Sequence, residues 1–251
     1  MPIHYALLIS IGVLLVTKAR ATDPSFQAGK PIVLVNFSGL NVGDSITHLP
    51  GWSSPAPDDI SGVEPRLPSI DSERIVLTCT NGSNRFATSP RQEIAEKFSA
   101  SDDVYFSAWI NRYSSASSGA RIVFQSEDGI SLGALTIEPG APNRFGLSDA
   151  NGEYRYSSEE TGAKPNTWYE VVLVIRPDDK EVTSSRGYLF YREVSTQDEL
   201  EIVPGFEAGV LMGYGDSLNA THFETWVLQL RNNVQIDNLA LGTGKLEVRE
   251  R

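Results

Sequence analysis

Residues 165–179 read Pro165-Asn-Thr-Trp-Tyr-Glu-Val-Val-Leu-Val-Ile-Arg-Pro-Asp-Asp179, a run of aromatic and β-branched residues between two turn signals. Such a run is typical of a strand in the middle of a sheet. Successive side chains of a strand point to opposite faces, so one face here is entirely apolar: Tyr169, Val171, Leu173 and Ile175. The other face is apolar apart from one carboxylate: Trp168, Glu170, Val172 and Val174. A strand of this composition needs cover on both sides, which predicts a layered β protein.

Shorter runs of the same kind recur along the chain, and residues 104–113 alternate clearly enough to predict a second central strand. Further strands are expected at residues 32–37, 75–80, 94–98, 121–125, 132–137, 144–147, 154–156, 187–192, 225–231 and 234–241. Residues 89–93 resemble a helix start, but the alternation that follows favours a strand. No long amphipathic helix and no internal repeat are visible. Short strands without helices for parallel crossovers predict an all-β fold, one antiparallel two-sheet sandwich.

The first 21 residues have the pattern of a secretory signal peptide. An apolar core at residues 5–16 precedes Ala19-Arg-Ala21, an A-x-A cleavage site. No Lys or Arg precedes the apolar core, which departs from the usual pattern. The alternative is a short membrane anchor, but twelve apolar-leaning residues fall well below the ~20 that a spanning helix needs. We therefore expect a signal peptide at 1–21, one domain at 22–251, and a secreted, periplasmic or extracellular protein with no membrane span.

Charge and cysteine content exclude several classes of protein. Without Lys18 and Arg20, 19 basic residues remain against 32 acidic ones, a net charge of −13. Phosphate backbones and anionic membranes repel such a surface, so nucleic acid is not an expected partner. The single cysteine, Cys79, allows no internal disulfide. Because Cys79 alternates with Ile75 and Leu77, we interpret it as a buried apolar thiol.

Four segments occur in an order that resembles a known family: 104–110 (VYFSAWI), 145–147 (FGL), 168–175 (WYEVVLVI) and 236–243 (IDNLALGT). The order resembles the secreted concanavalin A-like, or laminin G-type, jelly-roll modules of bacterial extracellular proteins, across roughly residues 30–245. The resemblance implies two curved antiparallel sheets, with the closing strand at 236–239 beside the first one. This fold hosts lectins, glycan-binding modules, hydrolases and lyases, so it does not by itself choose a function.

Motifs of the family's enzymes are missing. A retaining glucanase needs two carboxylates about 5 Å apart, and the Glu-x-Asp-x-x-Glu arrangement of the family does not occur. The nearest acidic pairs, Glu127 with Asp128 and Glu199 with Glu201, lie in predicted turns or polar stretches. The Gln-x-His strand of alginate lyase relatives is also absent, and no Gly-x-Ser-x-Gly turn presents a nucleophile. Catalysis is therefore the minority hypothesis.

A structural calcium ion is a further hypothesis. Calcium takes six to eight oxygen ligands from carboxylates and carbonyls, and an early loop and the last strand can lie side by side in a jelly roll. Asp44 and Asp237 are the candidate ligands. The alternative is that Asp44 forms a turn and Asp237 hydrogen-bonds to the backbone at a strand edge.

Sugar recognition requires aromatic platforms beside hydrogen-bonding side chains. The candidates are Trp109, Asn111, Tyr113, Arg121, Tyr154 and Tyr156. Each could equally fill the core, although Tyr154 and Tyr156 are bracketed by turns and are expected to be exposed.

Three functions remain open at this point. The leading hypothesis is a secreted non-catalytic jelly-roll module that binds a polysaccharide, a cell-surface glycan or another extracellular surface component. A polysaccharide-active hydrolase or lyase with an unrecognised site is the first alternative. A structural surface protein without a small ligand is the second. Carboxylates clustered in an open groove would favour the enzyme.

Overall fold

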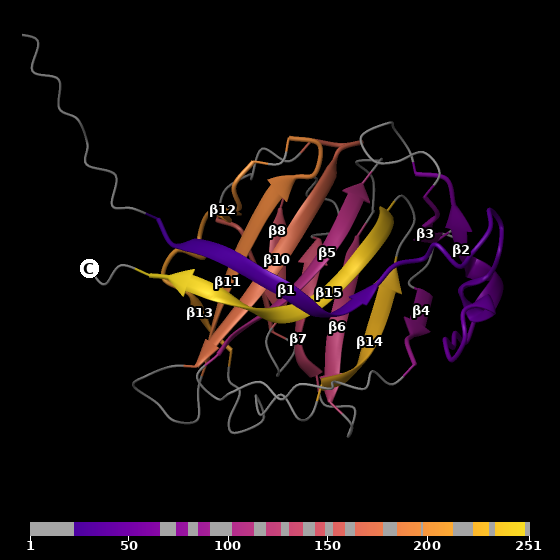
Figure 1. Ribbon diagram of the computed structural model, residues 1–251, viewed down its shortest axis with the longest axis horizontal. Coiled ribbons are helices and arrows are strands. Elements are labelled where there is room, and N and C mark those ends of the chain that lie inside the picture. The colour runs from indigo at the N-terminus through magenta and orange to yellow at the C-terminus, as the bar shows by residue number, and fades with distance from the viewer. Residues whose placement is uncertain are drawn as a thin grey trace, which may run out of the picture.

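Strand β10 (Trp168–Pro177) lies inside the larger sheet of a two-sheet antiparallel sandwich, shown in Figure 1. This computed structural model describes residues 23–65, 74–79, 85–90, 102–112, 119–126, 131–137, 144–148, 153–158, 164–177, 185–196, 198–212, 223–230 and 234–248. The predicted all-β antiparallel sandwich is confirmed. The strand expected at 94–98 lies outside the described residues. No helix in the described part of the chain is long and apolar enough to cross a membrane.

The larger sheet, called sheet A, has the order β12-β11-β10-β5-β15-β3-β2, with β1 also pairing with β15 and β13 with β11. Its strands are β1 (Ser25–Val35), β2 (Ile60–Val63), β3 (Val76–Cys79), β5 (Asp103–Arg112), β10, β11 (Ser185–Glu193), β12 (Glu201–Ile202), β13 (Val210–Leu211) and β15 (Val234–Glu247). The closing strand β15 lies beside the first strand, with Val35 opposite Leu239 and Ser25 opposite Glu247. This pairing agrees with the expectation drawn from the jelly-roll resemblance.

The smaller sheet, called sheet B, has the order β4-β14-β6-β7-β8-β9. Its strands are β4 (Arg85–Thr88), β6 (Ala120–Ser126), β7 (Ser131–Ile137), β8 (Phe145–Ser148), β9 (Tyr154–Tyr156) and β14 (Phe223–Leu230). In the view of Figure 1, sheet B lies behind sheet A.

The main core fills the space between the two sheets. The wholly apolar face of β10, formed by Tyr169, Val171, Leu173 and Ile175, belongs to this core, and Leu173 is fully buried. Phe106 of sheet A meets Trp226 of sheet B edge to face, with ring centroids 6.4 Å apart. Cys79 is buried, as its alternation predicted.

The long connection between β1 and β2 packs on the core. It contains two short 3-10 helices, η1 (Ile46–His48) and η2 (Pro57–Asp59), and the Ser45 hydroxyl accepts a hydrogen bond from the Thr47 backbone N–H at the start of η1. The buried rings of Phe37 and Trp52 meet edge to face at 5.9 Å. These contacts bury apolar surface that anchors a connection otherwise rich in turns.

A second apolar cluster lies on the outer face of sheet A. Val172 and Val174 of β10 pack there with Phe26 of β1 and Leu246 of β15. The paired β1 and β15 cross this face in front of β10 and β11 in Figure 1. β15 bends on the way, because its register with β5 shifts between Asp237 and Ala240, where Asn238 adopts a positive φ of 45°. The expected cover on both sides of β10 is therefore present.

Candidate functional site

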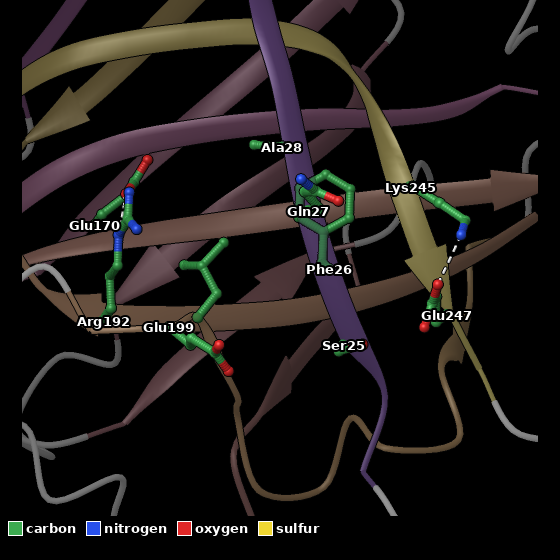
Figure 2. A pocket seen from close by; sticks show the side chains of 10 residues that line it. Ser25, Phe26, Gln27, Ala28, Glu170, Arg192, Glu199, Lys245 and Glu247 are labelled. Atoms are coloured by element: carbon green, nitrogen blue, oxygen red, sulfur yellow. Dashed lines mark hydrogen bonds and ion pairs between the residues drawn. The ribbon is translucent and has the colours of Figure 1, made fainter.

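A groove of about 520 Å³ opens where β1 crosses sheet A, and Figure 2 shows the side chains that line it. This volume is in the range of small-ligand sites, about 300–1,000 Å³. Five segments supply its lining: Ser25, Phe26, Gln27 and Ala28 from β1, Glu170 from β10, Arg192 from β11, Glu199 and Leu200 from the segment before β12, and Lys245 and Glu247 from β15.

An ion pair lines the sheet side of the groove. Glu170 and Arg192 are directly opposite across β10 and β11, and the Arg192 Nε atom donates to Glu170 Oε2 at 2.7 Å. Tyr105 lies on the neighbouring strand β5. Burial, and to a smaller extent the charge of Glu170, raises the pKa of its hydroxyl to about 12. Tyr105 is therefore neutral at physiological pH, and its hydroxyl donates to the Gly29 carbonyl of β1 at 3.2 Å.

The rim of the groove is also charged. Lys245 donates to Glu247 at 2.7 Å, and both side chains are well exposed. Glu199 has no ion-pair partner within the described ranges, since the pairs in the groove join Glu170 to Arg192 and Glu247 to Lys245. The lining thus holds three carboxylates against two cations, which leaves the charge of Glu199 unbalanced.

Beyond the groove, the outer face of sheet A continues through Trp109 to Asp237. Trp109 is opposite both Glu170 on β10 and Asp237 on β15. The guanidinium of Arg74 lies 5.0 Å from the centre of the Trp109 ring. It also donates to Asp237 Oδ2 from Nε at 3.0 Å and to Asn238 Oδ1 from Nη2 at 2.7 Å. Arg74 therefore covers part of the Trp109 ring and joins it to the bend in β15.

Asp237 is completely buried, and its carboxylate lies 2.8 Å from Arg74 Nη2. Burial raises the pKa of the Asp237 carboxyl above its usual value. Hydrogen bonds with the Asn238 backbone, with Arg74 and with the Phe37 backbone, together with the charge of Arg74, lower this pKa, but by less in total. Asp237 lies beside a bend in β15, which pairs with β5 on one side and with β1 and β3 on the other, so the residue is not at the strand edge that the structural alternative assumed.

Asp44 lies in a turn instead. Its Oδ2 accepts from the backbone N–H and the side-chain amide of Asn41, each at 2.8 Å, and its Oδ1 is 3.4 Å from His48 Nδ1. The backbone hydrogen bond from Asn41 is the main reason that the pKa of Asp44 is lowered.

A calcium site at these two carboxylates has a charge problem. Among the residues that the structure describes, no group of three or more His, Cys, Asp or Glu side chains is placed to hold a metal ion. Arg74 supplies the positive charge beside Asp237, and a second cation there would be repelled. The donor set around Asp237 therefore does not suit calcium, and the calcium hypothesis stays a prediction for a solution test.

Three sugar-binding candidates come together on the outer face of sheet B. Arg121 of β6 lies with its guanidinium 5.4 Å from the centre of the Tyr154 ring. Tyr154 and Tyr156 of β9 are stacked, with centroids 6.1 Å apart and an interplanar angle of 12°. Tyr154 is 49% exposed. We call Arg121, Tyr154 and Tyr156 the tyrosine cluster.

The floor beside the tyrosine cluster is made of small residues. Arg121 reaches across β7 to donate from Nη2 to Ser148 Oγ on β8, at 3.2 Å. Ser148 and Thr136 are buried, and Gly146 lies between Thr136 and Tyr156 in register. A Cβ atom at Gly146 would stand 2.6 Å from the Tyr156 ring and 2.9 Å from Thr136 Oγ1. Glycine at this position therefore lets the Tyr156 ring lie against the sheet.

Two polar atoms near the tyrosine cluster have no hydrogen-bond partner in the described part of the chain. They are Nε of Arg121 and Oγ1 of Thr136, and both are buried. Unpaired buried polar atoms are uncommon in folded proteins and call for an explanation such as water, an ion or a ligand. A small movement of the Arg121 side chain that let its Nε donate to Thr136 Oγ1 would offset part of the free-energy cost of burying these two atoms.

The remaining sugar-binding candidates lie elsewhere. Asn111 is fully buried in sheet A, opposite Trp168 and Gln235. Trp109 is also on sheet A, under Arg74, so neither residue meets the tyrosine cluster. Tyr113 lies outside the described residues. Thr136 and Ser148 were not among the sequence candidates, and neither were the Glu170 and Arg192 of the groove. The pairing of the strands places Thr136 and Ser148 beside the tyrosine cluster and Glu170 and Arg192 in the groove, and local sequence does not reveal that pairing.

Comparisons with known proteins add little beyond the fold. No protein-family model matches the sequence, and a search of curated proteins finds no match. Among solved structures, the marine PL-14 alginate lyase from Aplysia kurodai is 11% identical, with a TM-score of 0.49 over 86% of this chain and 100% of that chain. A protein of unknown function with a galectin-like fold from Bacillus subtilis is 12% identical, with a TM-score of 0.42 over 90% of this chain and 100% of that chain.

A sialidase is also similar, at 11% identity and a TM-score of 0.47 over 88% of this chain. The chain spans only 19% of the length of that sialidase. In all three cases the TM-score is below 0.5 and the identity is far below 25%, so no ligand or activity is inferred from these likenesses.

Proposed function

We propose that this protein is a secreted, non-catalytic module that binds glycans through the tyrosine cluster on sheet B. We also propose that its sandwich belongs with the concanavalin A-like, laminin G-type jelly rolls that its sequence resembles. Its partner would be a polysaccharide or a cell-surface glycan. The observation that carries the proposal is the placement of the Arg121 guanidinium over Tyr154, a ring that is half exposed and stacked on Tyr156.

This arrangement supports sugar binding for two reasons. The stacked Tyr156 ring and the Arg121 guanidinium lie against the Tyr154 ring and hold it in place, so little side-chain entropy is lost when a ligand packs against it. The guanidinium carries five N–H donors, and its hydrogen bond to Ser148 is the one made within the described residues. A sugar ring could pack on the exposed part of Tyr154 while its hydroxyl groups accept from Arg121.

A glycan array probed with the purified protein tests the proposal. Aromatic contacts contribute about 0.5–1.5 kcal/mol beyond area burial, so Tyr154→Ala should weaken binding roughly two- to twelvefold. Phe86→Ala is the matched control, because Phe86 is another exposed aromatic residue, 42% accessible, on the edge strand β4 of the same sheet. Array binding that is lost equally in both variants, or binding by neither the wild type nor the variants, would overturn the proposal.

A second function has one specific observation in its favour. The sheet A groove is lined by three carboxylates, Glu170, Glu199 and Glu247, and acidic groups in an open groove are what a polysaccharide hydrolase or lyase would need. Glu170 and Glu247 are already paired with cations, which favours the non-catalytic function. Release of reducing ends or unsaturated products from a polysaccharide panel by the wild-type protein would establish the enzyme instead.

Secretion is a separate part of the proposal. It rests on the apolar core at residues 5–16 and the A-x-A site that ends at Ala21. N-terminal sequencing of secreted protein should begin at Thr22, and recovery of an intact Met1 from the membrane fraction would contradict it.

A further inference from the structure

The outer edge of β1, which is the edge away from β15, faces the sheet A groove. The pairing of β1 with β15 shows which backbone groups of β1 point to that edge. Phe26 and Leu246 are opposite each other across these two strands. The Leu246 backbone N–H donates to Asp103 Oδ2 at 2.8 Å, and its carbonyl accepts from the Arg176 guanidinium. Both backbone groups of Leu246 therefore point away from β1. Residues in such a non-hydrogen-bonded antiparallel pair direct their backbone groups to opposite outer edges.

Phe26 consequently directs its backbone N–H and C=O away from β15, toward the groove that it lines. Ala28 is two residues further on and still in register with β15, so its backbone groups point the same way. No backbone hydrogen bond joins Phe26 or Ala28 to another loop or strand within the described residues. Within the part of the chain that the structure describes, two N–H donors and two carbonyl acceptors along this edge therefore have no backbone partner.

This edge is protected in the middle of β1 but not along residues 25–28. Natural sheets block exposed edges with proline, lysine or a bulge. β1 has all three features at its middle, where Lys30 and Pro31 coincide with register shifts between Ala28 and Val33. The segment 25–28, Ser-Phe-Gln-Ala, has none of them, and this is the part of β1 that lines the groove. An unprotected edge beside an open groove is a template for an added strand.

We propose that the groove is a docking site for a short extended peptide with a basic side chain, which adds as a strand to the outer edge of β1. An added strand lies ~4.8 Å from its neighbour and gains affinity from backbone hydrogen bonds. Phe26 and Leu200 provide apolar surface next to it, and Glu199 provides the unbalanced negative charge for a lysine or arginine. The overall net charge of −11 also favours a basic partner.

An open row of backbone groups favours a peptide over a glycan. Sugar sites are built from aromatic platforms and side-chain hydrogen bonds, and the groove has one aromatic lining residue, Phe26, which is only 8% exposed. The docking site is independent of the tyrosine cluster, which lies on the other sheet.

The test is a titration of the full-length protein, followed by NMR or fluorescence anisotropy, with capped hexapeptides of alternating valine and threonine that carry one lysine. The lysine peptide should bind at least tenfold more tightly than its glutamate counterpart. Two further peptides carry N-methyl groups on alternate backbone nitrogens, one on the odd and one on the even positions. Because only alternate N–H groups of an added strand face β1, one of the two peptides should bind at least tenfold more weakly. NMR shifts should centre on Phe26, Ala28 and Glu199.

Two protein variants separate the backbone and charge contributions. Ala28→Pro removes an N–H that points to the groove without removing a hydrogen bond to β15, and it should weaken peptide binding at least tenfold. Glu199→Lys should reverse the preference from the lysine to the glutamate peptide. Glu64→Lys is the matched control, because Glu64 is exposed and follows β2 at the far edge of sheet A, and it should bind like the wild type.

Several results would overturn the proposal. One is peptide binding that is insensitive to backbone methylation and to Ala28→Pro, and another is no peptide binding at all. Displacement of the peptide by neutral oligosaccharides with shifts at Phe26 would assign the groove to glycans. Dimerisation in sedimentation velocity that Ala28→Pro abolishes would assign the edge to a second copy of the chain. If Ala28→Pro does not fold, the methylated peptides still decide whether the edge pairs.

Discussion

Nη2 of Arg74 lies 2.8 Å from Oδ2 of Asp237, a carboxylate with no exposed surface. The same guanidinium rests over Trp109 on β5. One side chain therefore links the segment before β3 to the central strand β5 and to the bend in β15. Removing one member of a buried ion pair costs more than the pair contributes in net terms, because the remaining charge is left without compensation. Arg74 is thus expected to be a stability determinant of sheet A.

The stability of the protein should depend on pH through Asp237. Because burial raises the pKa of this carboxyl, the native state holds the proton more tightly than the unfolded chain. The stabilisation is complete below the unfolded pKa of about 3.9 and is lost as pH rises through the raised folded pKa. The free energy of unfolding of the wild type, relative to Asp237→Asn, should therefore fall as pH rises from about 3.5 toward 7. A difference that grows toward neutral pH would mean that pairing with Arg74 outweighs burial.

Replacing Trp109 by alanine should destabilise the protein. The ring is partly buried, packs with Trp168 and Val76, and carries Arg74 on one face. Losing this packing and the cation–π contact should cost on the order of 2 kcal/mol. Chemical denaturation measures the loss, and glycan binding at the tyrosine cluster should be unchanged at a temperature where the variant is folded. Lost glycan binding in a folded Trp109→Ala protein would place the sugar site on sheet A.

The sequence predicted the central strands better than the edges of the sheets. The dense run of aromatic and β-branched residues identified β10, and its two apolar faces predicted the cover that the structure shows on both sides. The first strand was predicted to begin at residue 32, yet most of residues 25–31 pair with the end of β15. Their strand conformation comes from that distant partner, which local composition does not reveal. The short edge strands β2, β4, β12 and β13 were missed for the same reason.

The candidate site was predicted residue by residue but not as a cluster. Arg121, Tyr154 and Tyr156 were each named from the sequence, while their proximity depends on the register of four strands, β6 to β9. Period-two alternation also separates Tyr105 and Asn111 from Phe106, and in the structure Phe106 belongs to the main core while Tyr105 belongs to the cluster on the outer face of sheet A. It could not show that both side chains would be buried there, Tyr105 under Phe26 of the crossing β1.

Gly146→Ala should disturb both stability and the tyrosine cluster. The added Cβ would stand 2.4 Å from the Arg155 carbonyl and 2.6 Å from the Tyr156 ring. Because one of these atoms is backbone, β9 must shift, at a cost of about 1–3 kcal/mol. Gly39→Ala is the control, since its nearest neighbour is the end of the Leu49 side chain at 3.1 Å. Equal melting temperatures for the two variants would show that β9 is not held against β8 as described.

Chelation tests the calcium hypothesis. If calcium bound Asp44 and Asp237 in the native state alone, saturation a hundredfold above Kd would add about 2.7 kcal/mol of stability. Because Arg74 already pairs with Asp237, we expect EDTA to leave the melting temperature unchanged. A clear fall with EDTA that excess calcium reverses would establish a cation site, and Asp44→Asn and Asp237→Asn would then show whether these two residues hold it.

Arg121 and Ser148 should differ in how they affect glycan binding. Arg121→Met keeps much of the side-chain length but removes the donors and the charge over Tyr154. It should therefore weaken binding at least as much as Tyr154→Ala. Ser148→Ala removes only the acceptor that orients the guanidinium and leaves the donors and the charge over Tyr154 in place, so its effect should be smaller than that of Arg121→Met.

Isothermal titration with the best ligand from the array measures both variants, and thermal melts confirm that they are folded. Arg121→Lys serves as the conservative variant, because it restores the charge without the planar fork, and it should recover only part of the affinity. Full recovery by lysine would mean that charge alone is recognised. Wild-type affinity in Arg121→Met would remove Arg121 from the site and leave the two tyrosines as a stacked surface pair.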